Sequence, residues 1–503
     1  MRSAEYLNSS LSAEQTNRLK LFRRNLAITR GIDGNRFYDD KAVDVVLKYA
    51  HHPSQVLEQL EYLRVLKDPL GYPFSRNLRI YSTTEDALKR FSEPNHTYYG
   101  WNNHFRSAVN RLKKELSFGS NLKPLRYKSD DDIINALPKL NTHSGFTFIE
   151  SGVKDKGKNL ENIFEKHQKT EEEAVKLGTF NRPILIGFRT QASGEYDDEG
   201  NQTDTCKHKC RVISMVDLYV IISELKFAKP VQDLLSRKQS YAGGKNEDDI
   251  GRIISNWRAK YSAYYSIDYS SFDQTLSNWL IREAFEVIRY LFANNLTDYE
   301  NQLLDVIIHD FINKVFVCYE GDVVSHKGVP SGSMWTQIVD SVCNLLMIYT
   351  YFDYLGIDSD CIVMGDDNLM FTRENYSPDF MTNLASYLYK LFGVVINAEK
   401  SSGGTVDNDP EFLSRYWTKY GRWRHPNSLL SRIAYPERYR NYSSEVTPQH
   451  VILAFCLSYN CGMNELINVK DFRRENPISS AQLFQKVDSR YLPGVMAYIR
   501  EYG

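Results

Sequence analysis

Two adjacent aspartates, Asp366 and Asp367, stand between short apolar runs at 361–364 and 369–371. With a glycine before them and Asn368 after them, they form the predicted tight turn of a β hairpin. Adjacent aspartates in turns are commonly only solvated turn formers. Here both flanking strands are apolar and therefore buried, which places the two carboxylates at the tip of a hairpin close to the body of the protein. This hairpin constrains the fold more than any other feature, because it requires a sheet with acidic groups at one end.

A third carboxylate, Asp268, ends another predicted strand at 263–268. Carboxylates at neighbouring strand ends can bind Mg²⁺, which leaves positions open for substrate phosphates. Two such ions about 3.5–4 Å apart can activate a 3′-hydroxyl and stabilise a leaving pyrophosphate. Asp273 is either the N-cap of the following helix or an acceptor for a ribose hydroxyl, and both roles stay open. A small acid at this place favours ribonucleotides over deoxyribonucleotides.

A loop rich in Gly, Pro and Ser, residues 328–333, opens a long apolar helix predicted at 334–355. Thr336, Asp340 and Asn344 follow at positions i, i+4 and i+8, as one polar stripe on an otherwise apolar helix. Buried polar groups need partners. A nucleotide sugar would supply them, and a purely structural network is the alternative. We favour the nucleotide because the stripe begins directly after the loop.

The predicted elements from residue 261 onward are a strand, a helix, a hairpin, a helix, a hairpin, a helix and a strand, which indicates an α+β fold. In that order they cover 263–268, 275–291, 314–325, 334–355, 361–371, 378–393 and 394–397. Two further strands are predicted within 187–215, around a polar loop at 194–200. One hydrophobic core stops growing at roughly 250–300 residues, so two or more lobes are expected for this chain.

The charges of the chain are balanced, with 62 Lys+Arg against 63 Asp+Glu and a net charge of -1. Any contact with nucleic acid must therefore be local. Residues 421–440 combine several arginines with one acid, Glu437, and interleaved aromatic residues, which suits a surface that contacts a backbone and stacks on bases. A solvated arginine-rich face is an equal alternative. The arginines are Arg422, Arg424, Arg432, Arg438 and Arg440.

Seven cysteines, an odd number, argue against a disulfide framework and for a reducing compartment. Cys206 and Cys210 have a spacing that matches no common zinc module. The first residues lack the apolar stretch of a signal peptide, and the longest apolar run, 343–355, is too short to span a bilayer. We expect a soluble intracellular protein.

Three groups of residues occur in the order of palm motifs A, B and C of viral RNA-dependent RNA polymerases, and the resemblance covers about residues 185–420. The groups are Asp268 with Asp273, the loop 328–333 with Thr336 and Asn344, and the turn 365–367. The stretches 188–191, 278–285 and 336–341 resemble the partitivirus family most, with picobirnaviruses next. Asn368 departs from the pattern, because Ser is expected there in most partitiviruses.

The resemblance implies a right-hand polymerase fold with an enclosed active site. It places an N-terminal segment and fingers at 1–265, with fingers returning at about 290–325, the palm with motifs A–E at 266–420 and the thumb at 421–503. It implies an RNA-directed RNA polymerase, a nucleotidyltransferase that replicates and transcribes a double-stranded RNA virus genome from nucleoside triphosphates and releases pyrophosphate.

Residue roles follow from the same resemblance. Asp268, Asp366 and Asp367 would hold two Mg²⁺ ions, for which Mn²⁺ can substitute, and Lys400 would protonate the leaving pyrophosphate. Nucleotide-binding residues would be Asp273, Ser331, Gly332, Thr336, Asp340, Asn344, Arg189, Lys209 and Arg211, although an exposed basic loop explains Arg189 equally well. RNA-binding residues would be Arg415, Arg422 and Arg424.

The implied partners are template and product RNA, nucleoside triphosphates and a viral capsid protein, with neither membrane nor DNA. The implied location is the interior of a virion or the host cytoplasm. Two alternatives stay open. A reverse transcriptase shares the carboxylates, but Asp273 and the loop 328–333 argue against it. A non-catalytic RNA-binding or particle-organising protein on a polymerase fold would bind RNA without incorporating nucleotides.

Overall fold

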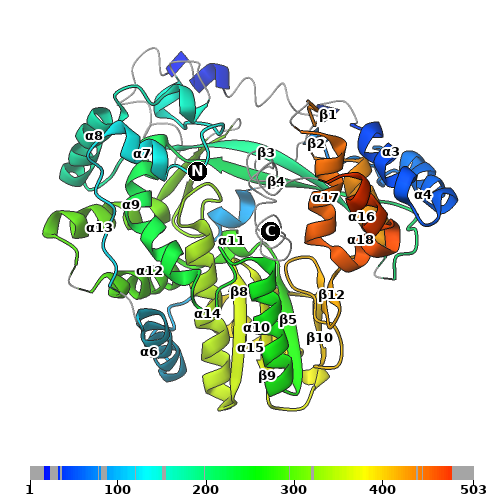
Figure 1. Cartoon of the computed structure of the whole chain (residues 1–503). Coiled ribbons are helices and arrows are strands. Elements are labelled where there is room, and N and C mark those ends of the chain that lie inside the picture. Colours follow the sequence, from blue (N-terminus) through cyan, green and yellow to red (C-terminus); the bar gives the residue numbers. More distant parts are fainter. Residues whose placement is uncertain are drawn as a thin grey trace.

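The computed structural model describes residues 16–17, 19–22, 32–33, 37–77, 79–80, 88–118, 121–149, 155–197, 199–293, 295–318, 322–437, 440–443 and 446–477. Figure 1 shows a sheet in the lower middle of the molecule and one helical lobe on the left and one on the right. Strands β3 and β4 cross from the left lobe to the right lobe above the centre.

The lower sheet has four antiparallel strands in the order β10-β5-β9-β8. The strands are β5 (Ala263–Tyr269), β8 (Ser359–Met364), β9 (Asp367–Thr372) and β10 (Ile396–Thr405). This order differs from the chain order, because β5 is inserted between β9 and β10. It brings the end of β5 next to the turn between β8 and β9.

Both faces of this sheet are covered by helices. On one face lie α14 (Thr336–Leu355) and α15 (Pro378–Phe392), which share one hydrophobic cluster with Cys361, Val363 and Met370 of the sheet. On the other face lies α10 (Glu247–Lys260), which packs on the alternate residues Ile362 and Phe371. Strands covered on both faces need apolar residues at consecutive positions, which explains the unbroken apolar runs in the sequence.

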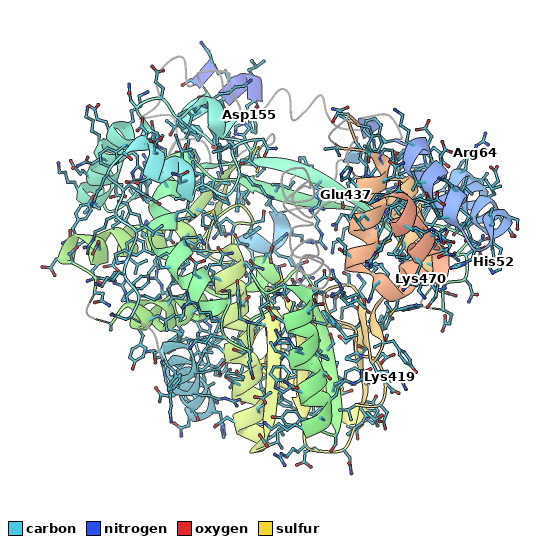
Figure 2. The ribbon with its side chains drawn as sticks, in the orientation of Figure 1. His52, Arg64, Asp155, Lys419, Glu437 and Lys470 are labelled. Carbon is cyan, nitrogen blue, oxygen red and sulfur yellow. The ribbon has the colours of Figure 1, made fainter. Side chains whose placement is uncertain are left out.

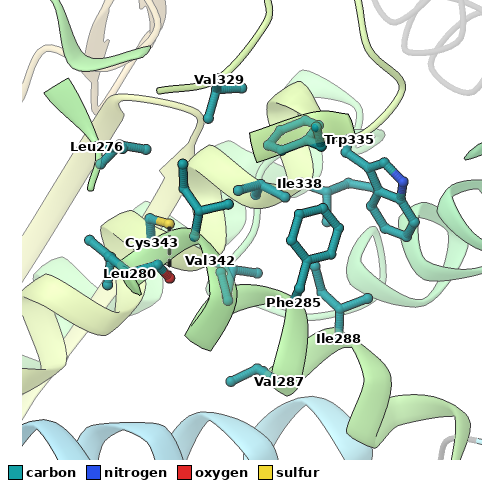
Figure 3. Packing of buried hydrophobic residues seen from close by; sticks show 14 of the residues in the cluster. Leu276, Leu280, Phe285, Val287, Ile288, Val329, Trp335, Ile338, Val342 and Cys343 are labelled. Atoms are coloured by element: carbon teal, nitrogen blue, oxygen red, sulfur yellow. Dashed lines mark hydrogen bonds between the residues drawn. The ribbon is translucent and has the colours of Figure 1, made fainter. Parts of the chain in front are cut away.

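Helix α14 is the central helix of the molecule and is buried almost all round. Figure 3 shows how Val342, Ile338 and Trp335 pack against Leu280, Phe285 and Ile288 of α12 (Asn278–Phe292). This packing fixes the beginning of α14, where the loop rich in Gly, Pro and Ser ends.

A second sheet has the strand order β4-β3-β6-β7. Its long hairpin pairs β3 (Ile184–Ser193) with β4 (Lys207–Met215), and β6 (Lys314–Val317) pairs with β7 (Val323–Ser325). The left lobe also contains the helices α6 (Asn103–Ser117), α7 (Asp130–Ala136), α8 (Ile163–Leu177), α9 (Leu218–Leu235), α11 (Phe272–Thr275) and α13 (Asp298–Ile312), with short 3-10 turns at Lys89–Ser92, Thr147–Ile149 and Lys156–Lys158.

The right lobe brings residues 37–77 together with residues 416–477. Its helices form one hydrophobic cluster, and Arg440 pairs with Asp39 at 2.7 Å while Lys48 pairs with Glu475 at 2.8 Å. The elements are α3 (Asp40–Tyr49), α4 (Pro53–Val65), α16 (Pro426–Ala434), α17 (Pro448–Ser458), α18 (Asn460–Leu466) and α19 (Val469–Glu475), with the hairpin β11 (Tyr416–Thr418) and β12 (Gly421–Trp423) and the short pair β1 (Ile32–Asp33) and β2 (Arg79–Ile80).

The predicted elements are confirmed in kind, and three of the boundaries that differ have a structural reason. The long central helix begins at Thr336 rather than 334, because the loop continues through Trp335. The helix predicted at 275–291 is interrupted at Leu276, whose ψ of 123° separates α11 from α12. The last strand, predicted at 394–397, runs from Ile396 to Thr405. Pairing with β5 holds this polar segment extended despite its glycines and serines.

Candidate functional site

The candidate site lies at the end of the lower sheet, where β8 turns into β9. Gly365 has a φ of 66°, a left-handed conformation that lets the chain reverse at the hairpin tip. Continuing the register between β5 and β9 places Asp268 beside Asp367, and Ile267 is hydrogen-bonded to Asn368 in agreement with this register. Three carboxylates predicted from two separate motifs therefore meet at one end of the sheet.

Burial and the nearby Asp366 disfavour the charged forms of Asp268 and Asp367. Burial raises the pKa of Asp367 to about 7, and Asp366 and Asp268 add to the rise. Burial also raises the pKa of Asp268; nearby Lys400 opposes this rise and Asp366 adds to it. A divalent cation would relieve this repulsion, and Mg²⁺ prefers such carboxylate oxygens. The donor set therefore fits the expected ions, although within the described ranges no group of three or more His, Cys, Asp or Glu side chains stands ready to hold a metal.

Asn344, predicted to face a nucleotide sugar, instead holds the hairpin turn. Its Nδ2 donates to the carbonyls of Gly365 and Asp366 at 3.0 and 3.1 Å, and its Oδ1 accepts from the Tyr269 hydroxyl at 3.0 Å. The side chain of Asn344 is fully buried. In this arrangement its amide is committed to protein partners.

Asp273 and Asp340 form a carboxyl pair beside the hairpin tip. Asp273 lies inside the short helix α11, so the alternative role as a helix N-cap is wrong; the N-cap of α12 is Ser277. The two side chains are hydrogen-bonded to each other, which requires one of them to carry a proton. Burial and Asp366 raise the pKa of Asp273 to about 6, whereas burial and Asp273 raise the pKa of Asp340 well above its usual value. The proton therefore resides on Asp340, which donates to Asp273.

This pairing predicts how substitutions at position 340 behave. Asp340→Asn keeps a donor toward Asp273, so we expect kcat/KM for ribonucleotides to stay within a few-fold of wild type. Asp340→Ala removes the donor, and a hydrogen bond to a charged group contributes about 1.5–3 kcal/mol, so a loss of roughly 10- to 100-fold is expected. Steady-state incorporation assays check both variants. Equal losses in the two would contradict the assignment of the proton to Asp340.

The loop at 328–333 is pressed against strand β4. The Ser331 hydroxyl accepts a hydrogen bond from the Ser214 amide at 3.0 Å, and a Cβ added at Gly332 would lie 1.9 Å from the Ser214 carbonyl oxygen. The Thr336 hydroxyl donates to the Pro330 carbonyl at 2.7 Å, within the loop itself. Gly332 and Thr336 thus shape the loop, while Ser331 keeps its own hydroxyl hydrogen for another acceptor.

The loop is also held by Glu224 of α9, a residue that the sequence analysis did not single out. One carboxylate oxygen accepts from the Ser333 hydroxyl at 2.7 Å and the other from the Met334 amide at 2.8 Å. The Glu224 side chain is 2% exposed, and Lys156 is the one charged group that acts on it among the described residues. No short motif surrounds Glu224 in the sequence, so only its burial on an apolar helix could have marked it.

Glu224 should give the protein a measurable pH dependence of stability. Burial raises its pKa to about 7, above the usual value for glutamate, despite the two hydrogen bonds and Lys156 that lower it. At pH values between the unfolded pKa of about 4.5 and the folded pKa of about 7, the folded state binds a proton that the unfolded state has lost. Protonated Glu224 therefore stabilises the fold fully below about pH 4.5, and this stabilisation is lost as the pH rises through 7. We expect the melting temperature of wild type, minus that of Glu224→Gln, to fall from pH 5 to pH 8. A difference that rises with pH would contradict this sign.

The basic residues of the long hairpin face the carboxylates. Burial lowers the pKa of Lys209, as do Arg211 and Lys400, while Asp268 and Asp366 raise it. Arg211 likewise acts on Asp268. The structure thus brings Lys209 and Arg211 together with the acidic site, as predicted for groups that hold a triphosphate.

Arg189 lies opposite Arg211 in the hairpin but has a partner of its own. Its guanidinium pairs with Glu437 at 2.6 Å, at the point where the hairpin reaches the right lobe (Figure 2). The structure therefore uses Arg189 to link the two lobes.

Lys400 is exposed on β10, next to the site. The neighbouring Ser401 hydroxyl accepts a hydrogen bond from the Asp268 amide at 3.0 Å, where an irregularity in the pairing of β10 and β5 lies between Asn397 and Ser402. This irregularity brings Lys400 close enough to act on the Asp268 carboxyl.

The three arginines predicted to bind RNA are bound within the protein. Arg415 and Arg422 both pair with Glu247 of α10, Arg422 at 3.1 Å. Arg424 donates to the Ser414 carbonyl at 2.6 Å. The Arg415 and Arg422 pairs attach the hairpin of β11 and β12 to α10 and partly neutralise these two arginines, whereas the Arg424 contact stays within the hairpin segment.

The far end of the long hairpin is anchored in the right lobe by a buried ion pair. Arg76 Nη2 lies 2.5 Å from Glu195 Oε1, with the two side chains 7% and 6% exposed. Glu195 also accepts from the Ser431 hydroxyl of α16 at 2.9 Å. Arg76 donates in addition to the Ala192 carbonyl at 2.9 Å. The hairpin of β3 and β4 that crosses between the lobes in Figure 1 is therefore held in the right lobe by these side-chain contacts.

Among the described helices, none combines the length and hydropathy needed to cross a bilayer.

Comparisons with known proteins agree on one family. The sequence model described as "Viral RNA-dependent RNA polymerase" matches residues 71–464. The chain is 31% identical over 169 residues to the RNA-directed RNA polymerase of Cryptosporidium parvum virus 1 (strain KSU-1), which covers 32% of this chain and 30% of that protein. It is 35% identical over 136 residues to the RNA-directed RNA polymerase of Atkinsonella hypoxylon virus (isolate 2H), with 25% and 20% covered. The aligned stretches thus span less than a third of either relative's length.

A solved structure is similar over almost the whole chain. The crystal structure of the RNA-dependent RNA polymerase of a human picobirnavirus aligns with a TM-score of 0.62 at 15% identity, over 95% of this chain and 89% of that chain. The match confirms the right-hand polymerase fold, and the comparisons together confirm the resemblance drawn from the motifs.

Proposed function

The chain belongs to the viral RNA-dependent RNA polymerase family, whose model matches most of its length, and on that premise we propose that it copies an RNA template into RNA from ribonucleoside triphosphates. The observation that carries the proposal is the meeting of Asp268, Asp366 and Asp367 at one sheet end, opposite Lys209 and Arg211. Acidic groups for metal ions and basic groups for a triphosphate are what nucleotidyl transfer requires.

Asp268 and Asp366 would hold two divalent ions, Mg²⁺ or Mn²⁺, with Asp367 assisting. When bound, such ions supply charge stabilisation for the attacking 3′-oxygen and the departing pyrophosphate. Asp366 adds to the rise in the pKa of both Asp268 and Asp367, which supports the assignment because a cation would offset this repulsion.

The remaining predicted residues divide into two groups around these carboxylates. Asp273, with Asp340 donating to it, and Ser331 would hold the ribose, since Asp273 then stays an acceptor for a 2′-hydroxyl. Lys209 and Arg211 would hold the phosphates, and exposed Lys400 would give its proton to the pyrophosphate. Gly332, Thr336 and Asn344 would act indirectly, by shaping the loop and the hairpin turn.

The lobes map onto the parts of a polymerase hand. The proposed palm covers 266–420, the fingers most of 1–265 and about 290–325, and the thumb 421–503. Residues 37–77 pack with the thumb helices in one hydrophobic cluster, so we place that segment on the thumb side. The proposed partners are template RNA, product RNA and a capsid protein, inside a double-stranded RNA virus particle or the host cytoplasm, without membrane or DNA.

Incorporation of labelled ribonucleotides on a single-stranded RNA template, with Mg²⁺ or Mn²⁺, tests the proposal. Wild type is compared with Asp366→Ala and with a matched control, Asp379→Ala, which removes an exposed carboxylate at the start of α15. We expect template-dependent product from wild type and from Asp379→Ala, and none from Asp366→Ala. RNA binding by wild type without any product would favour a non-catalytic RNA-binding protein on this fold. Product from all three proteins would remove Asp366 from the metal site.

A further inference from the structure

The turn that carries Asp366 is tied to its surroundings by two buried asparagine side chains. Asn368 and Asn344 are 1% and 0% exposed. The Asp366 carbonyl accepts from Nδ2 of both, at 3.1 Å in each case. Two amide groups from different elements, β9 and α14, thus converge on one carbonyl.

Each asparagine also reaches β5 on one side of Asp268. Asn368 donates to the Ile267 carbonyl at 3.0 Å and accepts from the Ile267 amide at 3.1 Å. Asn344 accepts from the Tyr269 hydroxyl at 3.0 Å. The residues before and after Asp268 are therefore bound to the same two amides that hold Asp366.

We infer that Asn344 and Asn368 are positioning residues that set the separation between the Asp268 and Asp366 carboxylates, and thereby the affinity of this site for divalent ions. The inference rests on the proposed function of these aspartates as metal ligands. It also accounts for Asn368, the residue that departs from the expected motif. A shorter hydroxyl side chain there could not bond to both groups of Ile267 and to the Asp366 carbonyl at once.

The arrangement has the chemistry that such a role needs. Partners of metal ligands that fix their orientation typically change metal affinity or activity by roughly 10- to 100-fold when removed. An amide serves here better than a carboxylate, because both Asp366 and Ile267 present carbonyl oxygens that need N–H donors. Neither asparagine needs to touch the ion.

The test measures metal affinity separately from catalysis. Mn²⁺ binding is followed by electron paramagnetic resonance, and the Mg²⁺ concentration for half-maximal incorporation is measured in parallel. Asn344→Ala and Asn368→Ala should each weaken both by roughly 10-fold or more. The double variant should weaken them by less than the product of the single effects, because both amides hold the Asp366 carbonyl.

Two further variants keep the test decisive. Tyr269→Phe removes one donor to Asn344 while it leaves the ring in the core, so it should fold and shift metal affinity in the same direction by a smaller factor. Thr372→Val changes the far end of the same hairpin, where the hydroxyl's one contact within the described part of the chain is with the Glu374 carbonyl at 3.4 Å, and should leave affinity unchanged.

The outcomes separate this inference from the proposed function. If Asp366→Ala abolishes Mn²⁺ binding while the asparagine variants bind like wild type, the positioning role is overturned and the polymerase site stands. If Asp366→Ala binds Mn²⁺ like wild type, the metal site itself is misassigned. A lower maximal rate with unchanged metal affinity in the asparagine variants also overturns the inference.

Discussion

Asp268→Asn is expected to reduce ribonucleotide incorporation by roughly 1,000-fold or more, because charge stabilisation by a bound ion contributes several kcal/mol and each 1.36 kcal/mol is tenfold in rate. The substitution keeps the volume of the side chain and the bond from the backbone amide to Ser401. Single-turnover incorporation with separately measured RNA affinity is the appropriate assay. We expect RNA affinity to change little.

The three aspartates should not be equivalent. Asp366→Asn should match Asp268→Asn. Asp367→Asn should lose less, because burial and its two neighbours raise the pKa of Asp367 to about 7, so this carboxyl carries only part of a charge near neutral pH. Asp379→Asn provides the control for a lost surface charge. Activity close to wild type in Asp268→Asn would mean that the catalytic carboxylates lie elsewhere.

Loss of the ion pair between Arg76 and Glu195 should be the largest effect on stability. Removing one partner of a buried pair leaves an uncompensated charge and costs about 3–5 kcal/mol. We therefore expect Glu195→Ala to lower the free energy of unfolding by that amount. Because the pair anchors the long hairpin to α16, hydrogen exchange should speed up around residues 192–203 and 427–433, and activity should fall.

Two variants control this result. Arg189→Ala breaks the partly exposed pair with Glu437, with side chains 47% and 28% exposed, and should cost less than about 1 kcal/mol. Replacing Arg76 and Glu195 together by methionine should recover much of the stability, because apolar substitutes for a buried ion pair are often neutral. A double variant as unstable as Glu195→Ala would show that the pair itself is not the anchor.

The hairpin tip and its carboxylates could be predicted because they depend on local patterns. Apolar flanks around Asp366 fix a buried turn, and Pro378 and Gly393 bound their helix as expected, with Gly393 at a φ of 71°. The extension of β10 could not be predicted in the same way. Its serines and glycines have low strand propensity, and only pairing with β5 holds them extended.

The supporting residues of the site were missed because their roles depend on distant partners. Asn368 looked like a departure from a motif, yet its amide bonds to a strand about 100 residues earlier in the chain. Glu224 and Ser333 are 109 residues apart. Asn344 was identified as a polar residue in need of a partner, but periodicity could not say that the partner is the hairpin turn rather than a nucleotide.

The packing of α3 against α16 in the right lobe has a consequence for synthesis. Helix α3 begins at Asp40, and α16, against which it packs, begins at Pro426. These starting points are about 390 residues apart, and chains grow at roughly 5–20 residues per second. The apolar face of α3, with Val43 and Val46, therefore waits for about 20–80 s before its partner exists. During that interval a nascent chain presents an unpaired hydrophobic surface, so folding yield in the cell should depend on chaperones that cover α3 until α16 has been synthesised.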